Sequence, residues 1–290
     1  MKDITTGKFS CRLCSQKYFQ SKYFTNNCYI VECNFCGLVQ LANNPAPEEL
    51  GSRYAENYFK HGKYIQDYSA LKEQERRLAF LKRCKIKPGA KILDAGCATG
   101  DFITAVKNDY QVWGRDISEF AIQEAKRLNP EIKERLSSGP LEELDFSGEE
   151  YDVIIMWDVI EHLPDPLSVV KKLKSGLKHG GLLLLSTPNI GAFMARLMGK
   201  RWALMTPPEH ITFFNRKTIT KLLHSCGLEM FEWKTRGKWV NLGFMIYKIS
   251  RVFPKLVPDP VVNFFKKNRF GRIPIYIPTG DIQYVGARKR

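Results

Sequence analysis

From about residue 88 onward, short apolar runs alternate with amphipathic segments. The continuous apolar run at 151–157 is typical of an inner strand in a parallel sheet, and Ser118 and Asn215 are suited to begin helices. This alternation predicts a doubly wound α/β sheet that binds its ligands at the carboxyl ends of the strands. We expect strands at 91–94, 111–116, 151–157, 182–186 and 282–287, with helices near 102–108, 118–128, 165–177 and 215–226.

The first 45 residues have a different pattern, dominated by cysteine. Two CxxC pairs, Cys11/Cys14 and Cys33/Cys36, are separated by 18 residues, and Gly37 permits a tight turn after the second pair. This spacing predicts a four-cysteine zinc ribbon, with metal-free reduced thiols as the alternative. Because four thiolates fill a tetrahedral site, we expect the zinc to be structural, and we interpret Cys28 as a small apolar residue.

A linker and a helical lead-in at 46–87 are expected to join the ribbon to a main domain at 88–290. Apolar positions predict a helix over 67–83. An aromatic stretch precedes this helix, and we expect most of it to pack the helix onto the main domain, with one or two rings covering a ligand pocket. The stretch consists of Tyr54, Tyr58, Phe59, Tyr64 and Tyr68.

Charge is unevenly distributed over the 290 residues, whose formal net charge is +15. Residues 101–150 contain 6 basic and 12 acidic side chains, whereas residues 201–290 contain 17 and 5. The basic terminal third favours nucleic acid, a phosphorylated substrate or a membrane surface as partner, with a solvated basic surface as the alternative. There is no apolar run of about 18 residues and no apolar leader, so we expect a cytoplasmic protein.

The loop from Asp94 to Gly100 (DAGCATG) follows the first strand of the main domain and consists mainly of small residues. Such a loop lets backbone amides approach a ligand closely. Asp116 ends the next strand, where a carboxylate can accept hydrogen bonds from ribose hydroxyls. Neither GxGxxG nor GxxxxGK[ST] occurs, so a pyrophosphate or triphosphate ligand is less favoured.

Four segments together resemble class I S-adenosylmethionine-dependent methyltransferases, in the bacterial branch that includes ubiquinone-type O-methyltransferases. They are ILDAGCATG at 92–100, GRDIS at 114–118, YDVIIMWDVIEHLPD at 151–165 and LKHGGLLLLSTPN at 177–189. The resemblance covers about 85–230 and implies a mostly parallel seven-stranded, Rossmann-like sheet that binds S-adenosylmethionine. Members with an N-terminal zinc ribbon also occur, and some of them modify sugars or polysaccharides.

The resemblance also implies a set of cofactor contacts. The Asp94–Gly100 loop would hold the methionine part, Asp116 the ribose and Ile117 the adenine. Adenine recognition would involve Leu141 or Glu142, since the acidic residue usual after the third strand is not obvious, and Ala98 stands where the family often has glycine. The implied cofactor residues are Asp94, Gly96, Cys97, Gly100, Asp116, Ile117, Leu141, Trp157 and Asp158, the last two at the methyl-transfer end.

A hydroxyl or carbon acceptor must lose a proton when it is methylated, and the five histidines of the chain are the first candidates to accept it. Glu209 and His210 lie in an apolar insertion at 190–214, which we interpret as a substrate-side cap, and they are the first candidate acid–base pair. His162 is the second candidate, and a structural role remains the alternative for each. Ubiquinone-type relatives can hold a divalent metal at acidic–acidic–His positions, which Asp158, Glu161 and His162 match loosely.

A second insertion, at 236–280, is basic and aromatic. It suits a membrane interface or a cover over a phosphorylated or lipid-linked substrate, and the alternative is a packed subdomain with a solvated basic face. The sequence therefore predicts a methyltransferase acting on a small molecule, sugar or glycan. An RNA methyltransferase is the first alternative, although no Asn/Asp-Pro-Pro-aromatic motif follows the strand at 151–157. A non-catalytic partner-binding protein that retains the fold is the second.

Overall fold

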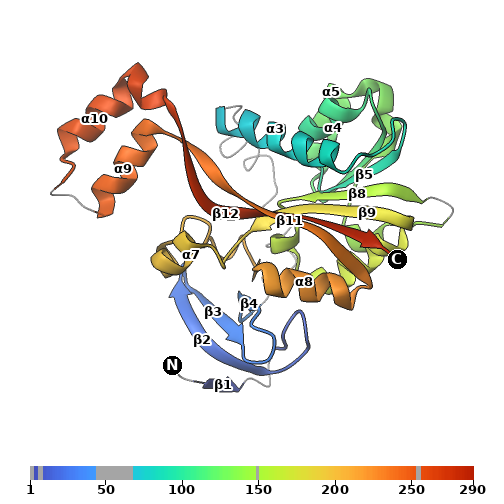
Figure 1. Cartoon of the computed structure of the whole chain (residues 1–290), viewed down its shortest axis with the longest axis horizontal. Coiled ribbons are helices and arrows are strands. Elements are labelled where there is room, and N and C mark those ends of the chain that lie inside the picture. The colour runs from blue at the N-terminus through green and yellow to red at the C-terminus, as the bar shows by residue number, and fades with distance from the viewer. Residues whose placement is uncertain (1–2, 6–8, 44–67, 148–149, 253–255) are drawn as a thin grey trace.

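In the computed structural model, residues 3–5, 9–43, 68–147, 150–252 and 256–290 are described, and two sheets organise them (Figure 1). The larger sheet has seven strands in the order β11-β12-β9-β8-β5-β6-β7, and the smaller has five in the order β1-β2-β3-β4-β10. Of the predicted aromatic stretch, Tyr54, Tyr58, Phe59 and Tyr64 lie outside the described residues.

The seven-stranded sheet confirms the predicted α/β fold. Five neighbouring strands, β9, β8, β5, β6 and the edge strand β7, run parallel, and β12 pairs antiparallel with both β9 and β11. The carboxyl ends of these five parallel strands therefore lie at one edge of the sheet, where ligands of such sheets bind. The strands are β5 (Lys91–Ala95), β6 (Gln111–Asp116), β7 (Leu136–Ser138), β8 (Tyr151–Trp157), β9 (Leu177–Pro188), β11 (Leu228–Asn241) and β12 (Pro274–Lys289).

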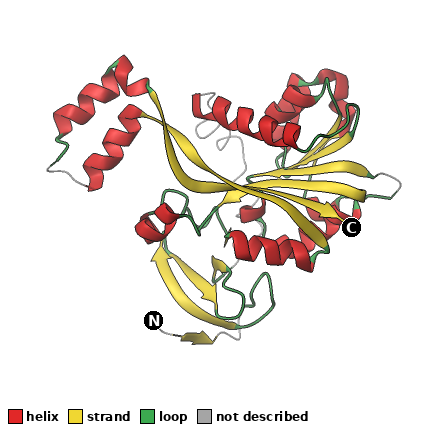
Figure 2. Cartoon of the chain, viewed as in Figure 1, coloured by secondary structure: helices red, strands yellow, loops and turns green. Residues whose placement is uncertain are grey.

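Helices cover both faces of this sheet, as Figure 2 shows. Successive residues of a strand point to opposite faces, so Ile155 packs with α3, α4 and α5, whereas Ile154 packs with α6 and α8. Ser118 and Asn215 accept hydrogen bonds from backbone N–H groups of the helices they begin, as predicted. The helices are α3 (Tyr68–Arg83), α4 (Asp101–Val106), α5 (Glu119–Leu128), α6 (Pro166–Ser175), α7 (Phe193–Met198), α8 (Arg216–Ser225) and the short turns η1 (Pro130–Arg135), η2 (Leu141–Glu143), η3 (Ile160–His162) and η4 (Gly199–Arg201).

The cysteine-rich N-terminus forms most of the smaller sheet. Its fifth strand, β10 (Thr212–Phe213), comes from the insertion at 190–214 and pairs with β4. Cys11 and Val31 belong to the same core cluster as Leu222 of α8, so this region is packed against the methyltransferase-like sheet. Its own strands are β1 (Asp3–Thr5), β2 (Tyr18–Thr25), β3 (Cys28–Cys33) and β4 (Val39–Leu41).

The far ends of β11 and β12 form a two-stranded ribbon, because β9 pairs with β12 only at 282–288. This ribbon carries a helical hairpin, consisting of α9 (Leu242–Val252), α10 (Asp259–Lys267) and the short turn η5 (Arg269–Arg272). Figure 1 shows the hairpin projecting from the body of the molecule. None of the described helices is both long enough and apolar enough to cross a membrane.

Candidate active site

The loop after β5 adopts backbone conformations that bring it close to its neighbours. Gly96 has φ +90°, and a Cβ at this position would lie 2.3 Å from Cγ2 of Val159. Ala98 and Asp158, which face ligands in the resemblance, both have positive φ without being glycine. Such backbone angles are disfavoured for L-residues and are concentrated at ligand sites. The sequence therefore specifies a tight turn where the strands end.

Asp94 lies beneath this turn and is 2% exposed. Burial raises the pKa of its carboxyl to about 7, although Arg77 acts in the opposite direction. Its Oδ1 atom has no hydrogen-bond partner within the described part of the chain. A buried carboxylate with an unused oxygen is suited to a cationic or hydrogen-bond-donating ligand.

Asp116 ends β6 and holds the turn in place. Its Oδ2 accepts a hydrogen bond from the N–H of Ala98 at 2.9 Å, and its Oδ1 accepts one from the N–H of Ser118, also at 2.9 Å. Burial raises the pKa of Asp116, and these backbone N–H groups act against that rise. Ile117 is half-exposed and Leu141 is buried. The carboxylate thus has a structural task in addition to the ribose contact predicted for it.

Arg77 is a site residue that the sequence did not reveal. Its Nη2 lies 2.6 Å from Oδ2 of Asp158, whose Oδ1 accepts a hydrogen bond from the Ser186 hydroxyl at 2.8 Å. Burial acts against the charge on Arg77, but Asp158 and Glu73 raise its pKa above the usual value. A signal was present, because position 77 lies four residues before Leu81 and so on the apolar face of the predicted helix.

Three buried polar atoms around this edge have no hydrogen-bond partner among the described residues. They are Oδ1 of Asp94, Nε of Arg77 and Nε1 of Trp157, which ends β8. Buried polar groups are normally paired, so unpaired ones at a strand edge indicate a ligand site. A ligand with both anionic and cationic groups, such as the amino-acid part of S-adenosylmethionine, matches this set of donors and acceptors.

A second cluster lies just beyond β8. One oxygen of Glu161 and one nitrogen each of His162 and His210 all lie within 4.8 Å of one another. The Nδ1 atoms of His162 and His210 lie 2.8 Å from backbone carbonyls, those of Glu209 and Leu204. Because a carbonyl only accepts, each Nδ1 carries a proton, which leaves Nε2 as the basic nitrogen of the neutral ring.

Glu161 is the buried carboxyl group of this cluster. It is 1% exposed, and its Oε2 accepts a hydrogen bond from the Thr187 hydroxyl at 2.8 Å. Of the predicted Glu209–His210 pair, the structure places His210 in the cluster, whereas Glu209 contributes its backbone carbonyl to His162. Asp158, named with Glu161 and His162 as a loose metal pattern, instead contacts Arg77 and Ser186.

The cluster is supported by the cysteine-rich sheet. Residue Ile211, next to His210, donates its N–H to the carbonyl of Glu161 at 2.8 Å and accepts the N–H of Leu41 at 2.9 Å. The Asn26 side chain donates to the carbonyl of Pro207 at 2.9 Å. The loop that carries His210 is therefore hydrogen-bonded on both sides of this residue: Pro207 and Ile211 both contact the N-terminal sheet, and Ile211 also contacts Glu161.

The four predicted zinc ligands come together. The Sγ atoms of Cys11, Cys14, Cys33 and Cys36 lie within 4.8 Å of one another, with Cys11–Cys36 at 3.4 Å and Cys14–Cys33 at 3.6 Å. The hydrogen bond from Cys11 lowers the pKa of the Cys36 thiol to about 5. The same hydrogen bond raises the pKa of the Cys11 thiol. The donor set fits zinc, which prefers four thiolates, and Cys28 lies outside the cluster.

Comparison with known proteins agrees with this geometry. A family model described as a methyltransferase domain matches residues 64–232, more than half of the chain. A ubiquinone biosynthesis O-methyltransferase from Marinobacter nauticus is 29% identical over 187 residues, 60% of this chain and 78% of that protein. A protein of the same name from Coxiella burnetii is 26% identical over 165 residues, 54% of this chain and 70% of that one.

Among solved structures, a magnesium protoporphyrin IX methyltransferase from Synechocystis with bound S-adenosylhomocysteine has the same fold. Its TM-score is 0.51 at 19% identity, covering 85% of this chain and 96% of that one. The fold and site thus define a class I S-adenosylmethionine-dependent methyltransferase. The chain belongs to the methyltransferase-domain family whose model it matches.

Proposed function

We propose that this enzyme methylates a hydroxyl group of a small molecule, and that a histidine of the cluster, His210 or His162, accepts the proton that the hydroxyl loses. S-adenosylmethionine supplies an activated methyl group when bound. A hydroxyl acceptor must be deprotonated as it reacts, whereas the sulfonium needs no activation by the protein. The relatives named above are O-methyltransferases, which supports a hydroxyl acceptor. Sugar, phosphorylated and lipid-linked acceptors stay open within this proposal.

The observation that carries the proposal is the position of the two-histidine cluster. Trp157, at the end of β8, belongs to the proposed cofactor edge, and only two residues separate it from η3, which carries Glu161 and His162. The buried Glu161 carboxylate would stabilise an imidazolium after proton transfer, as an anion does when it lies beside a histidine base. His210 is favoured as the base because the substrate-side insertion carries it.

On the cofactor side, we propose that Asp94 faces the cationic amino and sulfonium groups and that Arg77 faces the carboxylate. Gly96, Cys97 and Gly100 would form the turn around the amino-acid part. Asp116 and Ile117 would contact the ribose and adenine, with Leu141 on the adenine side. Trp157 and Asp158 would line the methyl-transfer end. The unpaired atoms of Asp94, Arg77 and Trp157 support this arrangement.

The test begins with labelled S-adenosylmethionine and extracts fractionated into small molecules, glycans and RNA. Label in a small-molecule hydroxyl is expected, whereas labelled RNA would favour the alternative acceptor class. His210→Asn keeps an N–H donor near the Leu204 carbonyl but removes Nε2, so turnover should fall by about 10²–10⁴-fold with unchanged cofactor affinity. His179→Asn, at an exposed position outside the site, is the matched control.

A divalent cation at the same three side chains is a second candidate, favoured by the convergence of their atoms within 4.8 Å. Two imidazoles and one carboxylate are common ligands of divalent metals. Turnover that depends on added Mg²⁺ or Mn²⁺, in protein that retains its zinc, would support this candidate. Metal-independent turnover with a bell-shaped pH profile would support the proton acceptor.

A further inference from the structure

The helical hairpin at 242–273 buries few of its apolar side chains completely. Among its described side chains, Val262 is the one fully buried apolar residue, whereas Met245, Ile246 and Phe265 are partly buried. The hairpin is instead held by close backbone contacts: a Cβ on Gly271 would lie 1.7 Å from the carbonyl oxygen of Phe265, and one on Gly243 would lie 3.2 Å from the same oxygen. The hairpin nevertheless leaves several of its large apolar side chains outside its interior.

Those side chains are exposed instead. Val261 and Phe264 are three residues apart on α10 and so share one side of the helix, and Phe264 is 51% exposed. Exposed apolar patches on a folded protein mark surfaces that bind a partner. The exposed large apolar residues of the hairpin are Phe244, Leu256, Val261, Phe264, Phe270 and Ile273.

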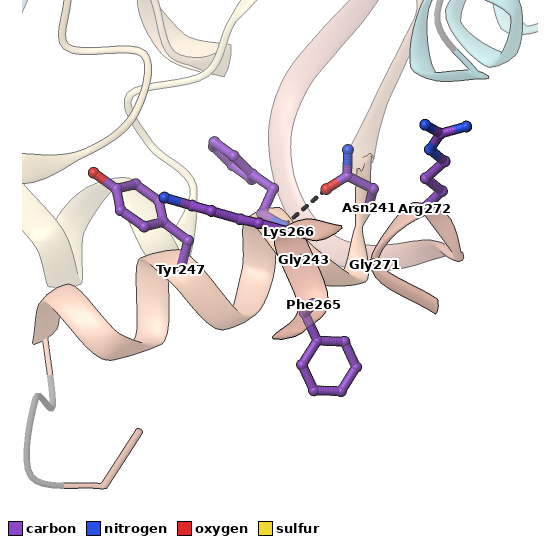
Figure 3. Close-up of a pocket in the computed structure, with 8 residues that line it drawn as sticks. Asn241, Gly243, Tyr247, Phe265, Lys266, Gly271 and Arg272 are labelled. Atoms are coloured by element: carbon purple, nitrogen blue, oxygen red, sulfur yellow. Dashed lines mark hydrogen bonds between the residues drawn. The ribbon is translucent and has the colours of Figure 1, made fainter. Parts of the chain in front are cut away.

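Cations lie among these apolar groups, and Figure 3 shows a hollow of the hairpin where both kinds meet. Lys266 reaches over the ring of Tyr247, with Nζ 4.7 Å from the ring centroid. Arg272 and Phe244 also line this hollow. Over 242–273 the sequence has seven Lys and Arg residues and a single acidic residue, Asp259, a net charge of +6.

The net charge of the hairpin distinguishes between a second copy of this protein and an anionic partner. A second copy of the same hairpin would bring a second net charge of +6 and be repelled, so the surface favours an anionic partner. Aliphatic Leu256, Val261 and Ile273 are exposed beside the phenylalanines. Aliphatic side chains offer nothing for stacking on nucleic acid bases, but they do enter the acyl region of a bilayer.

We propose that the α9–α10 hairpin docks on the surface of an anionic lipid bilayer. Its phenylalanine and aliphatic side chains enter the interface, while Lys266, Lys267, Arg269 and Arg272 contact lipid phosphates. Docking would occur in the interfacial plane, in agreement with the absence of a membrane-crossing helix among the described residues. This inference does not depend on the identity of the methyl acceptor.

The experiment is co-sedimentation of the full chain with vesicles of phosphatidylcholine alone or of phosphatidylcholine mixed with the anionic lipid phosphatidylglycerol. Binding should need the anionic lipid and weaken as salt rises. Lys266→Glu with Lys267→Glu should weaken vesicle binding by at least about tenfold, since each lysine near the surface contributes roughly 1 kcal/mol. Lys217→Glu with Lys221→Glu, on exposed positions of α8, is the matched charge control.

The apolar half of the surface is tested by Leu256→Ser with Phe264→Ser, which should also reduce vesicle binding by about tenfold or more. Phe24→Ser with Tyr29→Ser removes a comparable exposed pair from the N-terminal sheet and should leave binding unchanged. Circular dichroism and cofactor affinity establish that each variant is folded. Equal binding to neutral vesicles, or loss of binding only in the control variants, would overturn the proposal, as would RNA binding without vesicle binding.

Discussion

The N-terminal sheet and the α9–α10 hairpin are both additions to the methyltransferase sheet, but they are attached in opposite ways. The N-terminal sheet shares a core cluster with α6 and α8, and β10 from the insertion at 190–214 pairs with its strand β4. The hairpin is reached through a two-stranded ribbon and contributes Val262 as its one buried apolar side chain in the described chain.

This difference indicates which addition is coupled to catalysis. Shared buried surface and continuous hydrogen bonding transmit the state of one element to another, and the N-terminal sheet has both toward the loop of His210. The hairpin has few contacts through which its state could reach the cofactor edge. We therefore expect the first addition to control turnover and the second to act independently of it.

Loss of the thiolate cluster should have the largest effect. Cys33→Ser with Cys36→Ser should abolish the zinc binding predicted for this cluster and destabilise the N-terminal sheet by several kcal/mol or more, on the order of what structural zinc contributes to small domains. Because β4 then no longer anchors β10, turnover should fall by about 10²-fold or more as the His210 loop loses its position. Metal analysis, thermal unfolding and a turnover assay measure the three effects.

The same variant should still bind S-adenosylmethionine, since the cofactor site proposed above lies at the ends of β5, β6 and β8, outside the N-terminal sheet. An affinity for S-adenosylmethionine, measured by calorimetry, within a few-fold of that of the unmodified protein would support a role of the N-terminal sheet in turnover rather than in cofactor binding. Retained zinc at one ion per chain would contradict the four-thiolate site, and full turnover without zinc would contradict the coupling.

Gly271→Ala should have a smaller and strictly local effect. The added Cβ cannot fit 1.7 Å from the carbonyl oxygen of Phe265, so the hairpin should lose about 2–4 kcal/mol of local stability. Faster amide exchange confined to 242–273 is the expected result. A lower global melting temperature, or weaker cofactor binding, would show that the hairpin is coupled to the body after all.

The smallest expected effect is the pH dependence of cofactor binding. It should be the same in the Cys33→Ser/Cys36→Ser variant and in the Gly271→Ala variant. Because the pKa of Asp94 is about 7, a cationic ligand that requires its ionised form should bind about tenfold more weakly at pH 6 than at pH 8. The unliganded chain should also lose stability as pH rises from about 4 to about 7, because the folded state keeps a proton that the unfolded state releases. Calorimetry and thermal unfolding measure these dependences.

Asp94→Asn should abolish both pH dependences, since the amide does not titrate in this range. It should also weaken binding at pH 8, where the carboxylate is charged in the original protein. If the pH profile were unchanged in this variant, another group would have to be responsible.

Much of the central sheet could be predicted from local pattern. The run at 151–157 and the caps at Ser118 and Asn215 gave β8, α5 and α8, because apolar periodicity and capping are short-range signals. By contrast, β11 was not predicted. Bulges near Glu232 and Gly237 shift its side-chain alternation, so residues 228–241 lack a constant period of two.

Several candidate site residues could be named from the sequence, but their arrangement could not be predicted. Both His162 and His210 were candidates, yet their pairing depends on β10, a strand of two residues with no signal of its own. Arg77 was hidden in a helix that sequence pattern located correctly, because propensity does not tell which polar residue faces inward. Whether each of these residues has the role proposed for it stays a prediction.

The place of β10 also bears on how the chain acquires its structure during synthesis. The ribosome releases β4 early, but the strand that covers its open edge emerges some 170 residues later. Until then, the nascent N-terminal segment exposes an unpaired strand edge, which is a route to aggregation. Early metal capture by the cysteines would give that segment a defined shape while it waits for its last strand.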